Sequence, residues 1–519
     1  MSNNPARPEG LPATRLDAIA EAVGATLADT PAANGAAEVN GVSSSTNTVV
    51  QGSLFVALPG ARTHGAKFAT KAAASGATAV FTDPTGVELA SEAQLPVLVH
   101  PEPRRILGQV AALVYGTRRD APVLVGVTGT NGKTTTAYLV DALLRAIDVR
   151  SGLSGTVERR IGDTSITTRD SGRLTTPEAD DLHALNAAFR LDGVEAAAIE
   201  VSAQAITHHR IERLFFTSAI FTNFAQDHLD EYGTMDNYFQ AKLALFTPEH
   251  VGHGVTLVDD EWGVRLANEA QVPVATISTD AQTAADWHVT TREVELERTE
   301  FTLTSPDGRT LTSWVNQPGS FVAVDLAMAL VALVEAGFVF DRFLAALDET
   351  RGLEFTLPGR LDLVNAGGSG PRVYVDDGHT PASFAAVLTT LRQFTKGRLF
   401  MVFGADGDRD QTKRPDMART AAIADVVVVT DYNPRFEDPA AIRKVLVDTL
   451  HTEFPDREVY EIGDSAEGIR KAVSLATEDD IIFVGGHGHR QDVEVQGKFI
   501  SYSVKDAVRA ALRAEGWDA

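Results

Sequence analysis

The chain has 519 residues, of which 44% are apolar and 22% charged, and its formal net charge at pH 7 is −24. This length exceeds what one hydrophobic core supports, so we expect several domains of an ordinary soluble protein. The negative charge argues against a nucleic-acid-binding surface and against adsorption to anionic membranes, which require basic patches. Because cysteine is absent, disulfides and thiolate metal sites are excluded, and a reducing, cytoplasmic compartment is expected.

The first part of the chain predicts a short lead and a small domain. Residues 1–12 are polar and contain proline, and we expect them to be disordered, without the apolar segment of a signal peptide. No apolar run approaches 18 residues, so no membrane insertion is expected. Residues 13–120 alternate between helix-like and strand-like stretches. They predict a small α/β domain with strands at 54–58, 77–81 and 94–100 and a helix at 67–74.

A candidate phosphate-binding loop follows the next apolar strand, at 123–127. The loop reads Thr128, Gly129, Thr130, Asn131, Gly132, Lys133, Thr134 and Thr135, and it opens an amphipathic helix. In such a unit the loop amides and the helix N-terminus point at an anion. Lys133 would reach the β- and γ-phosphates, and Thr134 would hold Mg²⁺. Val127 stands at the first glycine position of the strict motif, so a turn that binds nothing is the alternative.

Two further regions repeat the alternation of strands and helices. Residues 121–355 predict strands at 196–200, 217–222, 293–303 and 310–315 and an apolar helix at 322–335. Residues 356–519 predict strands at 372–375, 399–403, 426–430 and 481–484 and a helix at 382–393. The expected fold class is therefore α/β in three domains. These are a smaller N-terminal α/β domain, a central parallel sheet with the phosphate loop, and a C-terminal Rossmann-like domain without a dinucleotide fingerprint.

Two candidate metal-binding segments follow predicted strands, where ligands of open α/β sheets bind. Glu200 ends one strand, although a strand-end cap is the alternative reading. Asp227, His228 and Asp230 follow another strand, and such a cluster can place two or three ligands around a divalent cation. An Asp–His pair is, however, often only structural. Lys242 lies in a helical, apolar stretch, where the sequence alone favours a solvent-exposed lysine.

Taken in order, these segments resemble the Mur ligase family, and within it the members that add the third residue of the peptidoglycan stem peptide. The resemblance covers nearly the whole chain. Besides the phosphate loop, it rests on Thr175-Thr176-Pro177, Glu200-Val201-Ser202 with Arg210, Thr222-Asn223 with 227–230, Pro358-Gly359-Arg360, Asp376 with His379-Thr380-Pro381, 404–415, and Asn433-Pro434-Arg435.

The resemblance implies an ATP-dependent ligase that adds an amino acid to UDP-MurNAc-L-Ala-D-Glu through an acyl phosphate, in the cytoplasm and as a monomer. It implies Mg²⁺ and a CO₂-derived carbamate on Lys242. The implied catalytic residues are Lys133, Lys242, Glu200 and His228, and the implied metal ligands are Thr134, Glu200, His228 and carbamylated Lys242. Implied ATP contacts outside the loop are Asn223, Asp325, Arg360, Asp376 and His379. The implied UDP-substrate contacts are Ser45, Thr46, Thr175, Thr176, Ser202 and Arg210, and those to the amino acid are Arg409, Asn433, Arg435, Gly486 and Arg490.

Departures from the family pattern lie mainly on the substrate side. Ser45-Thr46-Asn47 stands where the family has Asp-Ser-Arg, which leaves open the hydroxyl that meets uridine. Gln204 stands at a family His and Asp325 at a family Asn. If these changes abolish activity, a non-catalytic nucleotide-binding paralogue is the alternative, and a Mur-type ligase with a different acceptor is another.

Two departures concern the incoming amino acid. Tyr432 and Arg490 stand where members that use meso-diaminopimelate carry acidic residues. An acidic pair suits the distal ammonium of a diamino acid, and Arg490 would repel it. Unless a neighbouring carboxylate such as Asp431 compensates, the sequence supports neither lysine nor diaminopimelate, whereas the retained Arg435 favours a side chain that bears a carboxylate.

Overall fold

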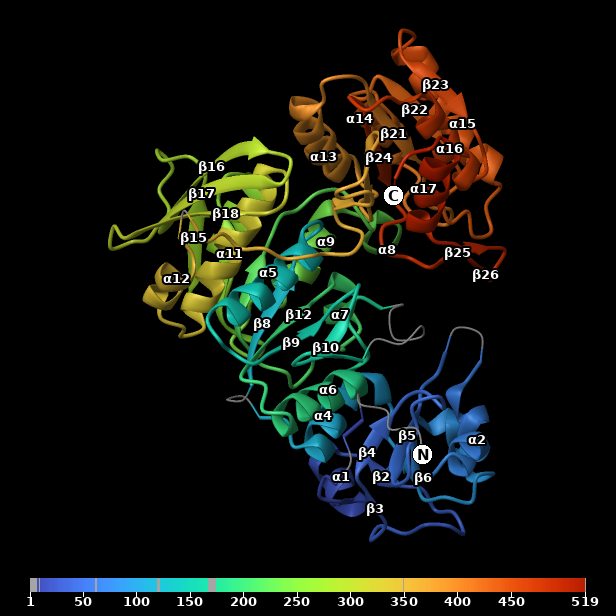
Figure 1. The fold of residues 1–519 in the computed structure, drawn as a ribbon. Coiled ribbons are helices and arrows are strands. Elements are labelled where there is room, and N and C mark those ends of the chain that lie inside the picture. The colour runs from blue at the N-terminus through green and yellow to red at the C-terminus, as the bar shows by residue number, and fades with distance from the viewer. Residues whose placement is uncertain are drawn as a thin grey trace.

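The structure is a computed structural model that describes residues 7–8, 10–60, 63–118, 122–166, 174–348 and 350–518. Its three large sheets succeed one another along the chain, and each is covered by helices (Figure 1). The α/β fold class is therefore confirmed. The predicted domain boundary at residue 120 falls outside the described residues, so this limit and the one at 355 stay predictions.

The N-terminal sheet has five strands in the order β2-β7-β6-β5-β4. Its strands are β2 (Thr26–Leu27), β4 (Gly41–Ser43), β5 (Ser53–Ala57), β6 (Ala77–Thr82) and β7 (Val97–Val99), and the helices around it are α1 (Leu16–Val23), α2 (Ala69–Ala74) and α4 (Pro103–Tyr115). The expectation of a disordered lead over 1–12 does not hold for Arg7, which is buried and forms an ion pair with Asp180 at 2.9 Å. The lead looked disordered because its bonding partners lie far along the chain.

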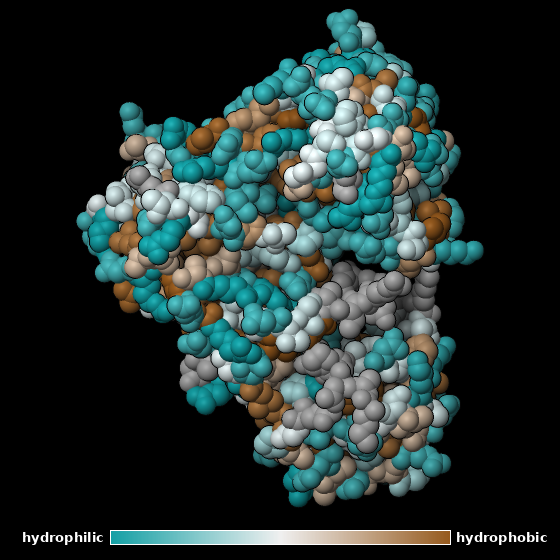
Figure 2. Space-filling view, in the orientation of Figure 1, coloured by the Kyte–Doolittle hydropathy of each residue, from teal (hydrophilic) through white to brown (hydrophobic). Residues whose placement is uncertain are grey.

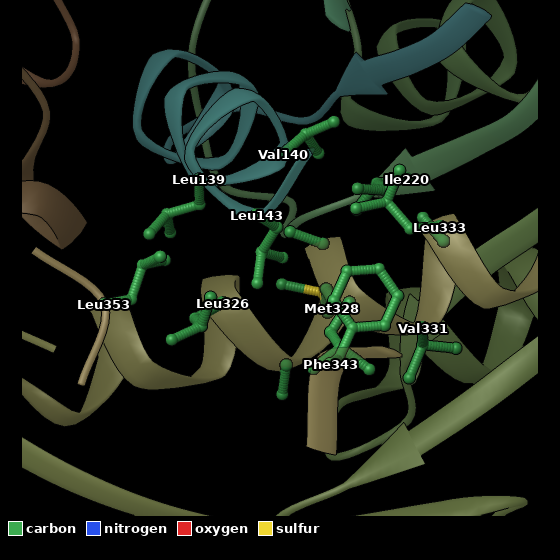
Figure 3. Packing of buried hydrophobic residues seen from close by; sticks show 14 of the residues in the cluster. Leu139, Val140, Leu143, Ile220, Leu326, Met328, Val331, Leu333, Phe343 and Leu353 are labelled. Atoms are coloured by element: carbon green, nitrogen blue, oxygen red, sulfur yellow. The ribbon is translucent and has the colours of Figure 1, made fainter. Parts of the chain in front are cut away.

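The middle sheet has eleven strands, and the phosphate loop leaves its interior. The central strands β9 (Ser151–Ser154), β12 (Ala196–Glu200), β8 (Val123–Thr128), β13 (Phe216–Phe221), β14 (Val251–Leu257) and β15 (Val274–Ser278) run parallel. Helices α5 (Lys133–Ala146) and α11 (Ser320–Glu335) pack on one face. Leu139 and Leu143 of α5 meet Leu326 and Met328 of α11 in the buried core (Figure 3).

One predicted strand of this sheet is wrong. The segment 293–303 is not one strand: it contains the end of β16 (Trp287–Glu295), a turn, and most of β17 (Arg298–Thr304), and the two strands pair as an antiparallel hairpin. The turn at Leu296 and Glu297 contains no glycine, proline or asparagine, and the alternation of apolar residues continues on both sides of it. The pattern therefore carried no turn signal. Strand β18 (Thr310–Val315) has the predicted bounds, but it pairs with β17 in antiparallel fashion, whereas a parallel sheet was expected.

The C-terminal sheet has six strands in the order β19-β20-β24-β21-β22-β23. They are β19 (Asp362–Leu363), β20 (Arg372–Asp376), β24 (Ile481–Gly485), β21 (Leu399–Phe403), β22 (Val426–Val429) and β23 (Glu458–Glu461). All pairs except β19–β20 are parallel, as a doubly wound sheet requires. Apolar clusters cover both faces, with α13 (Pro381–Phe394) on one and α17 (Val504–Ala514) on the other.

The domains are joined by packed elements as well as by the chain. Helix α6 (Ala179–Leu191) of the middle region packs on α4 and contributes Ala184 and Ala187 to the N-terminal core. At the other end, Leu296 of the β16–β17 turn is buried in the C-terminal core. The visible surface is mostly hydrophilic with scattered apolar residues (Figure 2). In the described part of the chain, no helix is long and apolar enough to cross a membrane.

Candidate active site

The loop between β8 and α5 has the backbone of a phosphate cradle. Gly129 and Gly132 have φ values of +147° and +83°, which side chains disfavour. A Cβ at Gly129 would lie 1.9 Å from Thr222 Oγ1, so only glycine fits there. Lys133 Nζ folds over the loop and donates to the carbonyls of Gly129 and Thr130 at 2.9 and 3.0 Å. Desolvation lowers the pKa of Lys133.

Neighbouring elements hold this loop in place. Asn131 N donates to Asn223 Oδ1 at 2.9 Å, and Asn223 Nδ2 donates back to Asn131 O at 3.1 Å. From the C-terminal domain, Thr380 Oγ1 donates to Asn131 Oδ1 at 3.3 Å. Asp325 of α11 lies on the other side, since a Cβ at Gly132 would come within 3.0 Å of its carboxylate. Burial raises the pKa of Asp325 well above its usual value.

Glu200 lies directly beside the start of α5. Thr134 Oγ1 donates to Glu200 Oε2 at 3.1 Å, and Thr156 donates to the same carboxylate from its amide and its hydroxyl at 2.9 and 3.0 Å. Burial nevertheless raises the pKa of Glu200. A Cβ at Gly155 would lie 2.1 Å from Glu200 Oε1, so a side chain at this position would collide with the carboxylate.

Lys242 is buried, with a relative exposure of 1%, so the surface position favoured by its sequence context is wrong. Its helix α9 (Met235–Leu243) packs against α7 (Ala203–Thr207). Lys242 Nζ donates to Gly129 O at 2.8 Å and stands 4.6 Å from the centre of the Tyr238 ring. Burial and the nearby Lys133 charge lower the pKa of Lys242 well below its usual value.

The Asp-His-Asp segment after β13 faces the C-terminal domain instead of forming a metal cluster. Asp227 pairs with Lys413 at 3.1 Å, and Asp230 lies 3.7 Å from Arg409. His228 lies next to Gln204, whose Nε2 is 3.3 Å from His228 Nδ1. In the chain as described, no three His, Asp or Glu side chains lie together as a ready metal site.

A magnesium ion fits this site only together with a phosphate ligand. Thr134 and Glu200 offer two adjacent oxygens, and Mg²⁺ usually takes one or two protein oxygens while phosphates and water complete its octahedron. Of the other two predicted ligands, Lys242 donates to the loop carbonyl of Gly129, and the centre of the His228 ring lies 6.0 Å from that of Tyr238, over which the Lys242 ammonium stands. Three of the four predicted ligands therefore lie in the loop, at its start or in direct contact with it, and His228 lies one side chain further away.

The Asp227–Lys413 pair gives a stability prediction. Both side chains are buried, at 7% and 5% exposure, so Lys413→Met leaves the buried Asp227 carboxylate without its lysine, with the His228 ring 3.5 Å away, and should cost about 3 kcal/mol. Lys444→Met removes an exposed pair with Asp448 and should cost less than about 1 kcal/mol. Thermal melting of both variants tests this. Adding Asp227→Asn should recover most of the loss, and equal melting temperatures for the two lysine variants would contradict the expectation.

An ion-pair chain links the phosphate loop to the C-terminal domain. Arg360 donates to Thr134 Oγ1 at 3.3 Å and pairs with Asp377 at 2.9 Å. Asp377 also pairs with Arg490 at 3.3 Å. Asp376, predicted to contact ATP, accepts the amides of Leu361 and Gly378 at 2.8 and 2.6 Å. These bonds fix the turn that carries Arg360.

His379 lies at the same edge, where its Nδ1 donates to the carbonyl of Asp377 at 2.8 Å. Of the ATP contacts predicted outside the loop, Asn223, Asp325 and Arg360 thus reach it directly.

The residues predicted to contact the UDP substrate fall into two groups. Thr175, Thr176, Ser202 and Arg210 come together: Thr176 Oγ1 donates to Glu200 O at 2.8 Å, Ser202 N donates to Thr176 Oγ1 at 2.9 Å, and Arg210 donates to Thr176 O at 3.4 Å. Ser45 and Thr46 lie in the loop after β4. Among the described residues, no hydrogen bond joins this loop pair directly to the other four.

The residues predicted to contact the amino acid surround Tyr432, except Arg409, which faces Asp230. Arg435 pairs with Asp406 at 3.4 Å, and Gly486 lies against the Tyr432 ring. Asn433 and Arg435 both have positive φ, at 37° and 52°, a strain typical of functional loops. Asn433 Oδ1 accepts the amide of Glu494, which attaches the β25–β26 hairpin (Asp492–Val495 and Lys498–Ser501) to this loop.

Asp431 does not supply the missing acidic group freely, because it is already paired with Arg443. Three further side chains of the site were not predicted as site residues: Thr156, Asp377 and Lys413. Their importance lies in contacts to residues distant in the chain. The available signals were the place of Lys413 in the segment 404–415, which carries the family resemblance, and the position of Asp377 two residues after the predicted strand 372–375.

Comparison with known proteins agrees with this architecture. Family models match residues 38–115 (Mur ligase family, catalytic domain), 127–333 (Mur ligase middle domain) and 359–488 (Mur ligase, glutamate ligase domain). Three such domains around a phosphate loop define an ATP-dependent ligase that forms amide bonds.

Individual relatives match almost end to end. The UDP-N-acetylmuramyl-tripeptide synthetase of Leifsonia xyli subsp. xyli is 46% identical over 481 residues, covering 92% of this chain and 93% of its own. The UDP-N-acetylmuramoyl-L-alanyl-D-glutamate–2,6-diaminopimelate ligase of Streptomyces coelicolor is 40% identical over 98% of both chains. A solved structure of a ligase with that same name has a TM-score of 0.61 at 26% identity, over 97% of this chain and 99% of its own. The chain belongs to the Mur ligase family.

Proposed function

We propose that this ligase adds the third amino acid to UDP-MurNAc-L-Ala-D-Glu in the formation of peptidoglycan precursors. The observation that carries the proposal is the near end-to-end match to a tripeptide synthetase, which includes the N-terminal domain with its Ser45-Thr46 loop. A ligase acting on an unrelated acceptor would not need that domain.

In the proposed reaction, a carboxylate of the UDP-linked dipeptide attacks the γ-phosphate of ATP, giving an acyl phosphate and ADP. The amine of the incoming amino acid then attacks the acyl carbon, and phosphate leaves. Lys133 and the loop amides hold the phosphates, while Arg360, which already touches Thr134, adds positive charge beside them. Bound Mg²⁺ would neutralise phosphate charge from the side of Thr134 and Glu200. Holding the reactants in line supplies much of the rate enhancement.

Lys242 would act in this site as a carbamate. A neutral amine attacks CO₂ and releases one proton, which leaves a carboxylate on the lysine nitrogen. The burial of Lys242 beside Lys133 favours the neutral amine that this reaction requires. The new anion would then face the positive charge of Lys133 and the metal.

The surroundings of Tyr432 favour an amino acid without a distal ammonium group. Arg490 and Arg435 lie on either side, and their carboxylate partners Asp377 and Asp406 are already paired. A second cation placed there would meet arginine without a free acidic partner among the described residues nearby.

The test is turnover with a panel of single amino acids. Purified protein with ATP, Mg²⁺ and UDP-MurNAc-L-Ala-D-Glu should release phosphate and give a product heavier by one residue with a neutral or acidic amino acid. With lysine or meso-diaminopimelate, kcat/KM should be lower by a factor of roughly ten or more. A factor of ten corresponds to about 1.4 kcal/mol of repulsion. Efficient use of either diamino acid would overturn the specificity, and no turnover at all would favour another acceptor or a non-catalytic role.

A further inference from the structure

The strongest unassigned feature is a buried arginine at the start of the chain. Arg7 is 5% exposed, and its guanidinium donates to Tyr115 Oη at 2.7 Å, to the carbonyl of Val42, and to the carboxylates of Asp180 and Asp181 at 2.9 and 2.5 Å. These bonds replace the water that would otherwise surround the guanidinium, and together they hold Arg7 in one position.

The partners of Arg7 belong to three separate elements. Tyr115 ends α4, Val42 lies in β4, and Asp180 and Asp181 open α6. The same guanidinium lies 3.5 Å from Thr48 Oγ1, in the loop that carries Ser45 and Thr46. Arg7 therefore lies where the N-terminal domain meets the middle domain, behind the candidate UDP-substrate site.

Asp180 makes the connection between the two groups of UDP-substrate residues. It is fully buried, and besides Arg7 it accepts hydrogen bonds from the amide and the hydroxyl of Ser44 at 2.8 and 3.0 Å. Ser44 directly precedes Ser45, and Asp180 follows Thr176 by four positions. One carboxylate thus ties the loop after β4 to the segment that bears Thr175 and Thr176.

Without Arg7, the Asp180 carboxylate would be a buried charge without its ion-pair partner. Such a charge draws in water or rearranges its surroundings, because an unpaired buried ion is strongly disfavoured. The part free to move is the Ser44 loop, whose Ser45 is exposed. Displacement of that loop would separate its hydroxyls from Thr175 and Thr176.

We propose that Arg7 is a positioning residue for the UDP-linked substrate, acting through Asp180 and Ser44 on the loop of Ser45 and Thr46. This inference rests on the proposed function insofar as that loop meets the UDP group. Arg7 itself touches no reacting atom, and it lies outside the ATP and amino-acid regions described above.

The experiment measures binding and kinetics on the full-length chain. Arg7→Ala should weaken binding of UDP-MurNAc, measured by calorimetry, and raise KM for UDP-MurNAc-L-Ala-D-Glu about ten- to a hundredfold, the effect of a small displacement of a binding loop. KM for ATP and kcat should change less than about twofold, since only substrate binding is lost. Arg15→Ala is the matched control, because the ion pair that Arg15 forms among the described residues is with the exposed Asp17, near the same end of the chain.

Two further variants separate positioning from folding. Ser44→Ala keeps the Arg7–Asp180 pair but removes one bond to the loop, and it should raise the same KM by a smaller factor. Arg7→Lys keeps the charge without the planar fork and should remain impaired. If Arg7→Ala lowers the melting temperature while UDP-MurNAc binds as in the unmodified protein, Arg7 is merely structural and the inference is wrong.

The outcomes also distinguish this inference from the proposed function. If the unmodified protein binds UDP-MurNAc but does not turn over the dipeptide substrate, the proposed reaction fails while the comparison of Kd values still decides the role of Arg7. A protein that does not bind UDP-MurNAc at all would overturn both.

Discussion

Lys133→Ala should reduce ligase turnover roughly 10²- to 10³-fold, the usual cost of removing one charge-stabilising donor from a reaction centre. The ammonium now satisfied by the carbonyls of Gly129 and Thr130 is the flexible cation closest to where the phosphates would lie. Phosphate release at saturating amino acid measures the effect. Because the lysine forms no ion pair at 4.0 Å or less among the described residues, its loss should leave folding largely intact.

Lys396→Ala is the control for this variant, since that lysine is exposed and distant in sequence from the loop. Lys133→Arg should also stay inactive, because a guanidinium cannot occupy the small space between two carbonyls of the loop. Turnover of Lys133→Ala near that of the unmodified protein would mean that other groups, such as Arg360, suffice for the phosphates.

Lys242→Ala should lower turnover at least about 10²-fold, because it removes the lysine that, in the proposed mechanism, carries the carbamate and completes the anionic side of the site. The shortened side chain leaves a buried space behind Gly129, so added acetate, a carboxylate of similar size, should restore part of the turnover. A ¹³C-bicarbonate label should give a carbamate signal by NMR in the unmodified protein and none in the variant.

Lys242→Arg separates the loss of the carbamate from the loss of packing. It fills the space and keeps a positive charge, but a guanidinium does not form the carbamate, so acetate should not help. Full activity of Lys242→Ala, or the absence of any ¹³C signal in the unmodified protein, would remove the carbamate from the proposed mechanism.

Local patterns predicted the elements whose signals are contained in one short segment. The strand, loop and helix around Lys133 were recognisable because glycine positions and apolar periodicity act within twenty residues. By contrast, the burial of Lys242 was not predicted, because its side chain bonds to Gly129, which is far away in sequence. The β16–β17 turn was not predicted because it contains Leu296, an apolar residue that packs in the core of the C-terminal domain and therefore gives no turn signal.

The same limit applies to the site. Glu200 and Asn223 could be proposed from their positions at strand ends, where parallel sheets gather ligands. Two sets of ion pairs could not be proposed from the sequence: those of Asp377 with Arg360 and Arg490, and that of Asp227 with Lys413. Ion-pair partners follow no periodic pattern in the sequence. Arg7 shows the same, since its partner Asp180 lies 173 positions away.

The buried tip of the β16–β17 hairpin has a mechanical consequence. The C-terminal domain is joined to the middle domain both by the chain after α12 (Phe340–Ala346) and by Leu296, which is inserted into its core beside the Glu297–Arg372 ion pair. The other contacts between the two domains described above, such as Thr380–Asn131 and Asp227–Lys413, are polar and can be exchanged for bonds to water, so we expect the chain and the hairpin tip to act as the hinge. Opening of the domain would therefore swing the Lys413 and Arg490 region away from the phosphate loop along an arc, while the hairpin tip stays seated as the pivot.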